Sequence, residues 1–132
     1  MMKIFIILLI MVGPATGFCQ SDAKQVIKVA GISLQQLIRG FLDAGYSIEK
    51  SEASMSVIIT HLKEAKKSNV ATLLKAKIQD GNLLLSGEYI VPGKDENHSP
   101  ITDAGNPGSA CNESWQMMQS FAQSFKKPLE IQ

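Results

Sequence analysis

The sequence is short of the residue types that most enzyme active sites use. Its 132 residues include two cysteines, two histidines and one tryptophan, and aromatic residues make up only 6% of the chain. It contains no HExxH, no G-x-S-x-G and no glycine-rich phosphate loop, the patterns that carry zinc, acyl-transfer and nucleotide chemistry. These absences favour a protein that is not an enzyme and that needs no cofactor and no metal ion.

An excess of charge of one sign is also missing. The chain has 13 Lys+Arg against 12 Asp+Glu, a formal net charge of +1. Domains that bind nucleic acid usually carry a strongly basic face, so we expect no nucleic-acid partner. Cys19 and Cys111 are too few to build a structural zinc site, which uses about four ligands.

The longest apolar run of the sequence lies at its N-terminus. It covers residues 4–12, follows Lys3 and stops at Gly13-Pro14. A basic residue, an apolar run and then small residues are typical of a secretory signal peptide. The run is too short to cross a hydrocarbon core of about 30 Å as a helix. We therefore predict a signal peptide over residues 1–19, export to the periplasm or beyond the cell, and no transmembrane span after cleavage.

The point of cleavage decides the fate of Cys19. Cleavage after Gly17 would leave Cys19 in the mature chain, where a disulfide to Cys111 could tie the two ends together. Cleavage after Cys19 would make Gln20 the first residue and Cys111 a lone thiol; this resembles exported proteins of the Bacteroidetes and is slightly favoured. A lipid anchor on Cys19 is disfavoured, because lipoprotein signals have a small residue where Phe18 stands.

Short alternating or β-branched runs predict five strands in the rest of the chain, residues 20–132. The clearest pair meets at Asp80-Gly81, a dipeptide that favours a type I′ hairpin turn because both central residues need positive φ. Before this turn apolar and polar residues alternate, as they do on a strand with one buried face. The expected strands are residues 25–30, 46–50, 55–62, 70–79 and 82–91.

Two amphipathic helices complete the predicted domain. Ser33 and Gln36 form a capping-box pattern before an apolar stripe that ends at Gly45. A second stripe begins after Asn112, the expected N-cap, and stops at Pro128. Two helices side by side can cover a sheet that one helix cannot. The prediction is therefore a single α+β domain, a two-layer sandwich with an antiparallel sheet of four to five strands and both helices on one face.

The other face of the predicted sheet is the first candidate binding surface. Polar and apolar residues mix there, which suits a modest protein interface. The second candidate is residues 94–110, predicted to be a long loop, since loops of this length are functional or disordered. Met117 falls off the apolar stripe of the second helix and is a further candidate. The candidate binding residues are Leu73, Lys75, Lys77, Leu84, Ser86, Glu88 and Met117.

Two alternatives to a protein-binding module remain open. One is a small-ligand carrier, with a pocket between the sheet and the helices lined by Tyr46 or Tyr89. The other, less favoured, is a small thiol or histidine hydrolase built on Cys111. Such an enzyme would need His61 or His98 within hydrogen-bond reach of Cys111 or of a carboxylate.

Several features along the chain carry a resemblance to a known group of proteins. They are Gly45-Tyr46 after a helix, the strand at residues 57–60, Gly87 in the second of two long strands, and Trp115 on the last helix. Their order resembles small exported α+β domains of uncharacterised Bacteroidetes proteins and, more distantly, the domains of BamC-type envelope lipoproteins that assist outer-membrane assembly. The resemblance implies a non-enzymatic module located in the envelope. Together with the residues above, it leads us to expect an exported binding or assembly-accessory module whose partner is an unidentified envelope protein or small ligand.

Overall fold

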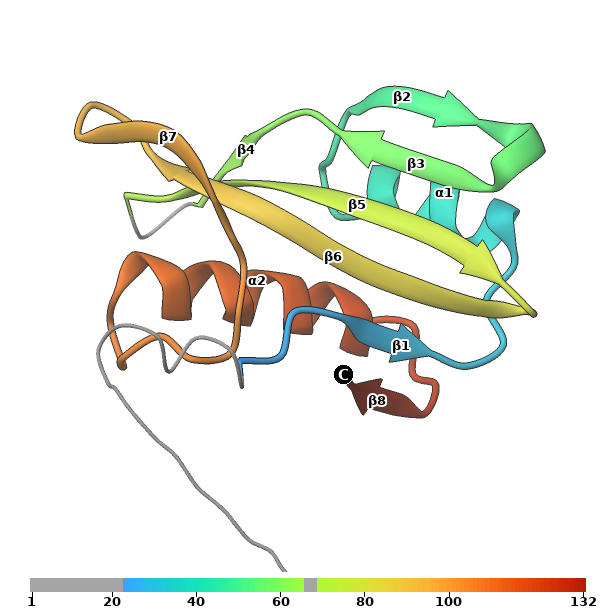
Figure 1. The fold of residues 1–132 in the computed structure, drawn as a ribbon. Coiled ribbons are helices and arrows are strands. Elements are labelled where there is room, and N and C mark those ends of the chain that lie inside the picture. The colour runs from blue at the N-terminus through green and yellow to red at the C-terminus, as the bar shows by residue number, and fades with distance from the viewer. Residues whose placement is uncertain (1–22, 66–68) are drawn as a thin grey trace, which may run out of the picture.

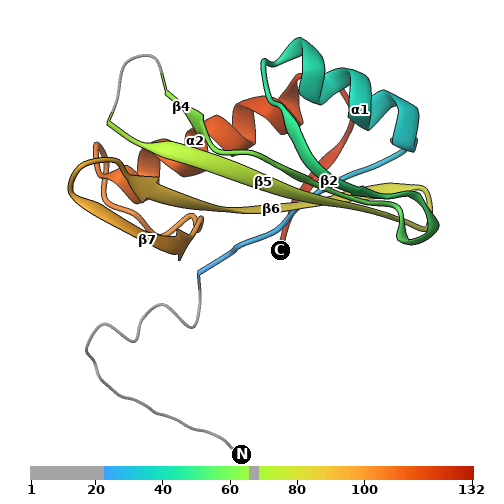
Figure 2. The same ribbon diagram turned by 90° about the horizontal axis from the view of Figure 1, so that it is seen from above.

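The computed structural model describes residues 23–65 and 69–132 of the chain. The predicted signal peptide, with Cys19, lies outside the described residues. Within them, an antiparallel sheet of eight strands carries two helices on one side (Figures 1 and 2). The α+β class agrees with the sequence prediction, whereas the expected sheet of four to five strands is too small. The elements are β1 (Ile27–Val29), α1 (Leu34–Asp43), β2 (Ile48–Glu52), η3 (Ala53–Met55), β3 (Val57–Thr60), β4 (Lys63–Glu64), β5 (Ala71–Gln79), β6 (Asn82–Val91), β7 (Asp95–Pro100), α2 (Ala110–Gln123) and β8 (Leu129–Ile131).

The hairpin of β5 and β6 forms the middle of the sheet. The two strands pair without interruption from Gln79 with Asn82 to Ala71 with Ile90, and the order across the sheet is β2-β3-β5-β6-β1-β8. Strand β4 also pairs with β5, and β7 also pairs with β6. At the turn, Asp80 and Gly81 have φ of 55° and 78°, so the expected hairpin is confirmed.

Three strands that the sequence did not predict enlarge the sheet. Strand β7 lies inside residues 94–110, which were expected to be a loop, and Ser99 and Pro100 pair with Tyr89 and Glu88. Its sequence is almost entirely polar, and β4 and β8 have only two and three residues. Such segments show no alternation to detect, because their pairing depends on the neighbouring strand rather than on local propensity. The loop prediction is therefore wrong for residues 95–100.

The helix ends follow from side-chain capping. At the start of α1, Ser33 Oγ accepts a hydrogen bond from the backbone N–H of Gln36, and the Gln36 side chain accepts one from the N–H of Ser33, which confirms the capping box. In α2 the N-cap is Ser109, whose Oγ accepts from Asn112 N–H at 3.1 Å. Asn112 is thus in the first turn rather than at the cap, because the serine three residues earlier already satisfies its N–H.

The hydrophobic core lies between the helices and one face of the sheet. Phe41 of α1 and Phe121 of α2 stack in parallel with centroids 4.6 Å apart. The ring of Tyr46 is steeply inclined to both, at 72° and 71°, with centroids 5.8 and 6.0 Å away. Leu74 and Leu85, which face this cluster from β5 and β6, have no exposed surface. Most of the apolar residues of both helices belong to this core, whereas Leu42 of α1 is 60% exposed. Within the described residues both helices lie on this face of the sheet, and no helix covers the opposite face (Figure 2).

Candidate functional site

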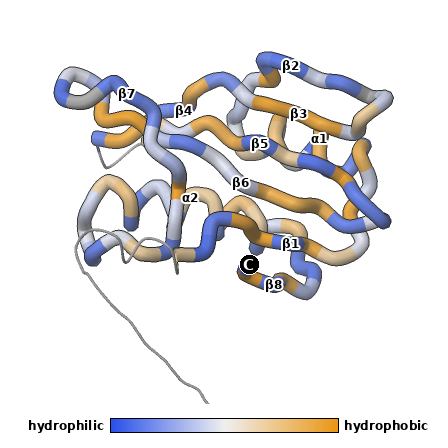
Figure 3. The backbone as a smooth tube through the Cα atoms, viewed as in Figure 1, coloured by the Kyte–Doolittle hydropathy of each residue, from blue (hydrophilic) through white to orange (hydrophobic). Residues whose placement is uncertain are grey.

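The face of the sheet turned away from the helices, seen in Figure 1, is the open face. Residues directly opposite each other on antiparallel strands share a face, so the strand registers identify its members. One row across the sheet contains Val57, Lys77, Leu84, Lys28 and Glu130. Leu84 is half-buried at its centre, with a lysine on either side. Figure 3 shows hydrophobic and hydrophilic segments side by side on β3, β5 and β6.

The predicted sheet residues also fall on the open face. Lys75 and Ser86 are opposite each other in a second row, and Leu73 and Glu88 in a third. Leu73 is only 8% exposed, so it contributes little surface that a partner could touch. Lys75, Lys77, Leu84, Ser86 and Glu88 all retain exposed or half-buried side chains.

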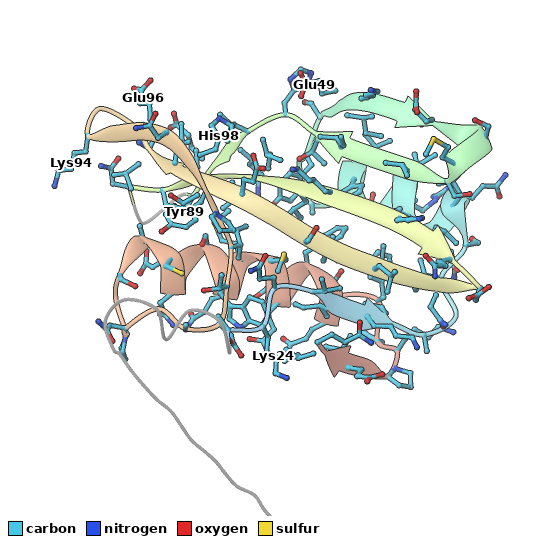
Figure 4. The ribbon with its side chains drawn as sticks, viewed as in Figure 1. Lys24, Glu49, Tyr89, Lys94, Glu96 and His98 are labelled. Carbon is cyan, nitrogen blue, oxygen red and sulfur yellow. The ribbon has the colours of Figure 1, made fainter. Side chains whose placement is uncertain are left out.

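An ion-pair cluster joins β5, β6 and β7 on the open face. Lys75 Nζ donates to Glu88 Oε2 at 2.7 Å, and His98 Nδ1 lies 2.9 Å from Glu88 Oε1. Figure 4 labels His98 where β7 runs beside β6. The sequence predicts two separate candidate surfaces, the sheet face and residues 94–110. Because β7 brings His98 to Glu88, they form one continuous surface.

The partners of Glu88 change its acidity. Hydrogen bonds first from Lys75 and then from His98 stabilise the carboxylate and hold its pKa below the ordinary value for glutamate. The side chains of Lys75, Glu88 and His98 are 43%, 31% and 44% exposed. Exposed pairs of this kind stabilise a fold by about 0–1 kcal/mol. The cluster therefore fixes the position of three side chains more than it stabilises the protein.

Cys111 and the histidines do not meet in the part of the chain that the structure describes. Cys111 lies in the first turn of α2, with Sγ 3.4 Å from Thr102 Oγ1, beside a cavity of about 390 Å³ that Tyr89 also lines. The backbone of His61 bonds to Ser47, and the ring of His98 bonds to Glu88. One requirement of a histidine hydrolase, a histidine near a carboxylate, is thus met at Glu88, but no hydrogen bond joins this pair to Cys111.

A groove lies at the other side of the sheet, where α1, β4 and α2 come together. Its volume is about 470 Å³, and Tyr46, Lys63, Glu113, Met117 and Phe121 are among its lining residues. Met117, the predicted contact residue outside the sheet, therefore does not share a surface with the other candidates. A pocket lined by Tyr46 was the expectation attached to a small-ligand carrier, and the structure contains one.

Lys28 and Lys63 were not among the predicted site residues. Lys28 stands between Ile27 and Val29, which are fully buried, so the alternation of this short strand already places it on the opposite, open face. Lys63 carries no comparable signal. Its position over the ring of Tyr46, at 5.1 Å from the ring centroid, depends on how β4 pairs with β5.

Comparison with known proteins finds no match to a family model and none to a curated protein. No helix within residues 23–65 and 69–132 is long and apolar enough to span a membrane. In the same two ranges, no group of three or more acidic, histidine or cysteine side chains has the arrangement of a metal site.

Proposed function

We propose that this chain is an exported, non-catalytic binding or assembly-accessory module of the bacterial envelope, and that its partner is a protein that docks on the open face. The support is the contrast between the two faces: two helices cover one, while the other has no helix over it in the described residues. A mixture of half-buried apolar and charged side chains is typical of interfaces between proteins that also exist apart.

The row through Leu84 is the observation on which the proposal depends. Leu84 lies between Lys77 and Lys28 on adjacent strands, and neither lysine makes an ion pair within the described part of the chain. An apolar side chain between two unpaired cations complements a partner surface that presents an apolar group flanked by carboxylates. Glu88, in contrast, already pairs with Lys75. Glu130 lies beside Lys28 at the outer end of the row, so the row through Leu84 has one positive charge more than negative charges.

Affinity capture from the native envelope tests this proposal with matched variants. Leu84→Ser removes the apolar centre of the open face, and Leu42→Ser is its control, because Leu42 is a leucine of α1 that is 60% exposed on the other side of the molecule. We expect the wild type and Leu42→Ser to recover the same partner in the same amount, and Leu84→Ser to lose it. A thermal melt shows whether each variant is folded.

A charge reversal checks the chemistry of the partner. Lys77→Glu places a carboxylate opposite the carboxylate expected on the partner, so less of the partner should be recovered. High salt screens this repulsion and should restore part of the recovery by Lys77→Glu, whereas it should not raise the recovery by the wild type. Equal recovery by the wild type, Leu84→Ser and Lys77→Glu would contradict docking on the open face. The intact mass of this chain, measured in the same sample, would give its cleavage site and any lipid on Cys19.

A further inference from the structure

The groove between α1, β4 and α2 has an aromatic floor. Tyr46 and Phe121 are each only 4% exposed, with ring centroids 6.0 Å apart in an edge-to-face arrangement. The hydroxyl of Tyr46 is 3.3 Å from Thr72 Oγ1, and burial raises the pKa of Tyr46. The floor is therefore aromatic and uncharged, with its two ring planes 71° apart, and Met117 of α2 adds a flexible apolar wall.

Lys63 supplies the positive charge of this groove. Its ammonium lies 5.1 Å from the centroid of the Tyr46 ring, within cation–π range, and its aliphatic carbons lie near Gly45. Within residues 23–65 and 69–132 no carboxylate comes within 4.0 Å of it. Lys63 is therefore a cation held in a fixed position over Tyr46. Its strongest hydrogen-bonding partner would be an anion, and the described residues do not supply one.

Glu113 gives the groove a direction. It lies in the first turn of α2, eight residues before Phe121, which is about 12 Å along a helix axis. Phe121 contacts Tyr46, over which Lys63 lies, so the backbone of Glu113 is displaced along the groove from these rings, and no ion pair joins Glu113 to Lys63. A ligand with negative charge at both ends would meet repulsion from Glu113.

We propose that this groove binds a small molecule with an apolar body and a single anionic group, with the anion on Lys63 and the body along the half-buried side chain of Met117, above the largely buried rings of Tyr46 and Phe121. The groove volume of about 470 Å³ lies within the usual range of small-molecule sites. This site is separate from the protein-docking open face, so either assignment can fail while the other stands.

Two probes test the ligand chemistry, decanoate and its dianionic analogue decanedioate, each measured by displacement of 1-anilinonaphthalene-8-sulfonate fluorescence. We expect saturable binding of decanoate and binding of decanedioate at least tenfold weaker. Equal affinity for the two, or no saturable binding of decanoate, would overturn the proposal.

Two lysine variants locate the site. Lys63→Gln should weaken decanoate about tenfold, whereas Lys77→Gln, which removes the same charge from the open face, should leave it unchanged. Met117→Ser shortens the apolar wall, so it should also weaken the binding of decanoate. The fluorescence of 1-anilinonaphthalene-8-sulfonate measured without decanoate should rise little with this variant. An equal effect of the two lysine variants would overturn the assignment to the groove, and unchanged melting temperatures would show that the variants are folded.

Discussion

The two faces of the sheet are made by the same strands but have different chemistry. On the covered face, Leu74 and Leu85 have no exposed surface and belong to the same core cluster as the stacked rings of Phe41 and Phe121. On the open face, Leu84 is half-buried between two lysines that lack ion-pair partners in the described residues. Burial thus restricts which residues the covered face can have, whereas the stability of the fold depends little on the residues of the open face. This difference leaves the open face free for a binding function.

The largest effect should come from emptying the covered face. Phe41→Ala removes a fully buried ring that contacts Tyr46 and Phe121, and we expect it to lower the free energy of unfolding by about 3–5 kcal/mol. Leu84→Ala on the open face should lower it by only about 1 kcal/mol, because the side chain is half-buried. Chemical denaturation of both variants gives the two values. Similar losses would mean that the two faces contribute equally to stability.

A smaller effect is expected at Gly87 of β6, where there is no room for a side chain. A Cβ on Gly87 would lie 2.5 Å from the carbonyl oxygen of Leu73 and 2.9 Å from Cδ1 of Ile101. Gly87→Ala should therefore lower the free energy of unfolding by about 1–3 kcal/mol. The adjacent variant Ser86→Ala, on the open face, should stay within about 0.5 kcal/mol of the wild type. Equal denaturation midpoints for the two variants would contradict a steric clash of a Cβ at position 87.

The cap of α1 tests how firmly the covering layer is held. Ser33→Ala removes the hydroxyl that accepts from Gln36 N–H, and a loss of about 1 kcal/mol is expected. Ser33→Asp, which keeps an acceptor at the cap, should recover most of this loss. Urea denaturation measures both variants, and a fully stable Ser33→Ala would show that tertiary packing alone holds the helix start.

The smallest effect concerns the ion pairs of the open face. Because the pKa of Glu88 is lowered in the folded protein, its carboxylate stabilises the fold above the ordinary glutamate pKa, and this contribution is lost as the pH falls through the lowered pKa. At neutral pH, Glu88→Gln should therefore cost less than about 1 kcal/mol. The difference from the wild type should vanish in acid and shrink with added salt.

Its control is Glu52→Gln, which removes a carboxylate that makes no ion pair in the described part of the chain. The unfolding free energy of this variant should run parallel to that of the wild type from neutral pH to acid. A pH-dependent difference for Glu52→Gln as large as that for Glu88→Gln would show that general charge, rather than Lys75 and His98, accounts for the effect.

The features that sequence patterns predicted are those that local chemistry determines. The capping box at Ser33 and the hairpin at Asp80-Gly81 each depend on residues within a few positions of one another, and both are confirmed. The alternation expected along β5 holds only from Leu74 onward, because Ala71, Thr72 and Leu73 are all buried. The N-cap of α2 was placed three residues late, because Ser109 and Asn112 are both good capping residues and sequence alone does not rank them.

The features that were missed depend on contacts between distant residues. Strand β7 pairs only because β6 offers it an edge, so the contact between His98 and Glu88 had no local signal. The same holds for Lys63 over Tyr46, which requires β4 to pair with β5. The sequence therefore indicated the two candidate surfaces but did not reveal that β7 joins them, nor that Met117 belongs to a separate groove.

Photo-crosslinking in the native envelope tests the binding role of the open face most directly. A photoreactive residue at position 84 lies at the centre of that face, and the same residue at position 42 lies on the exposed side of α1. We expect position 84 to give one discrete adduct with an envelope protein, and position 42 to give none. Adducts of equal yield at both positions, or an adduct at position 42 alone, would contradict the central claim.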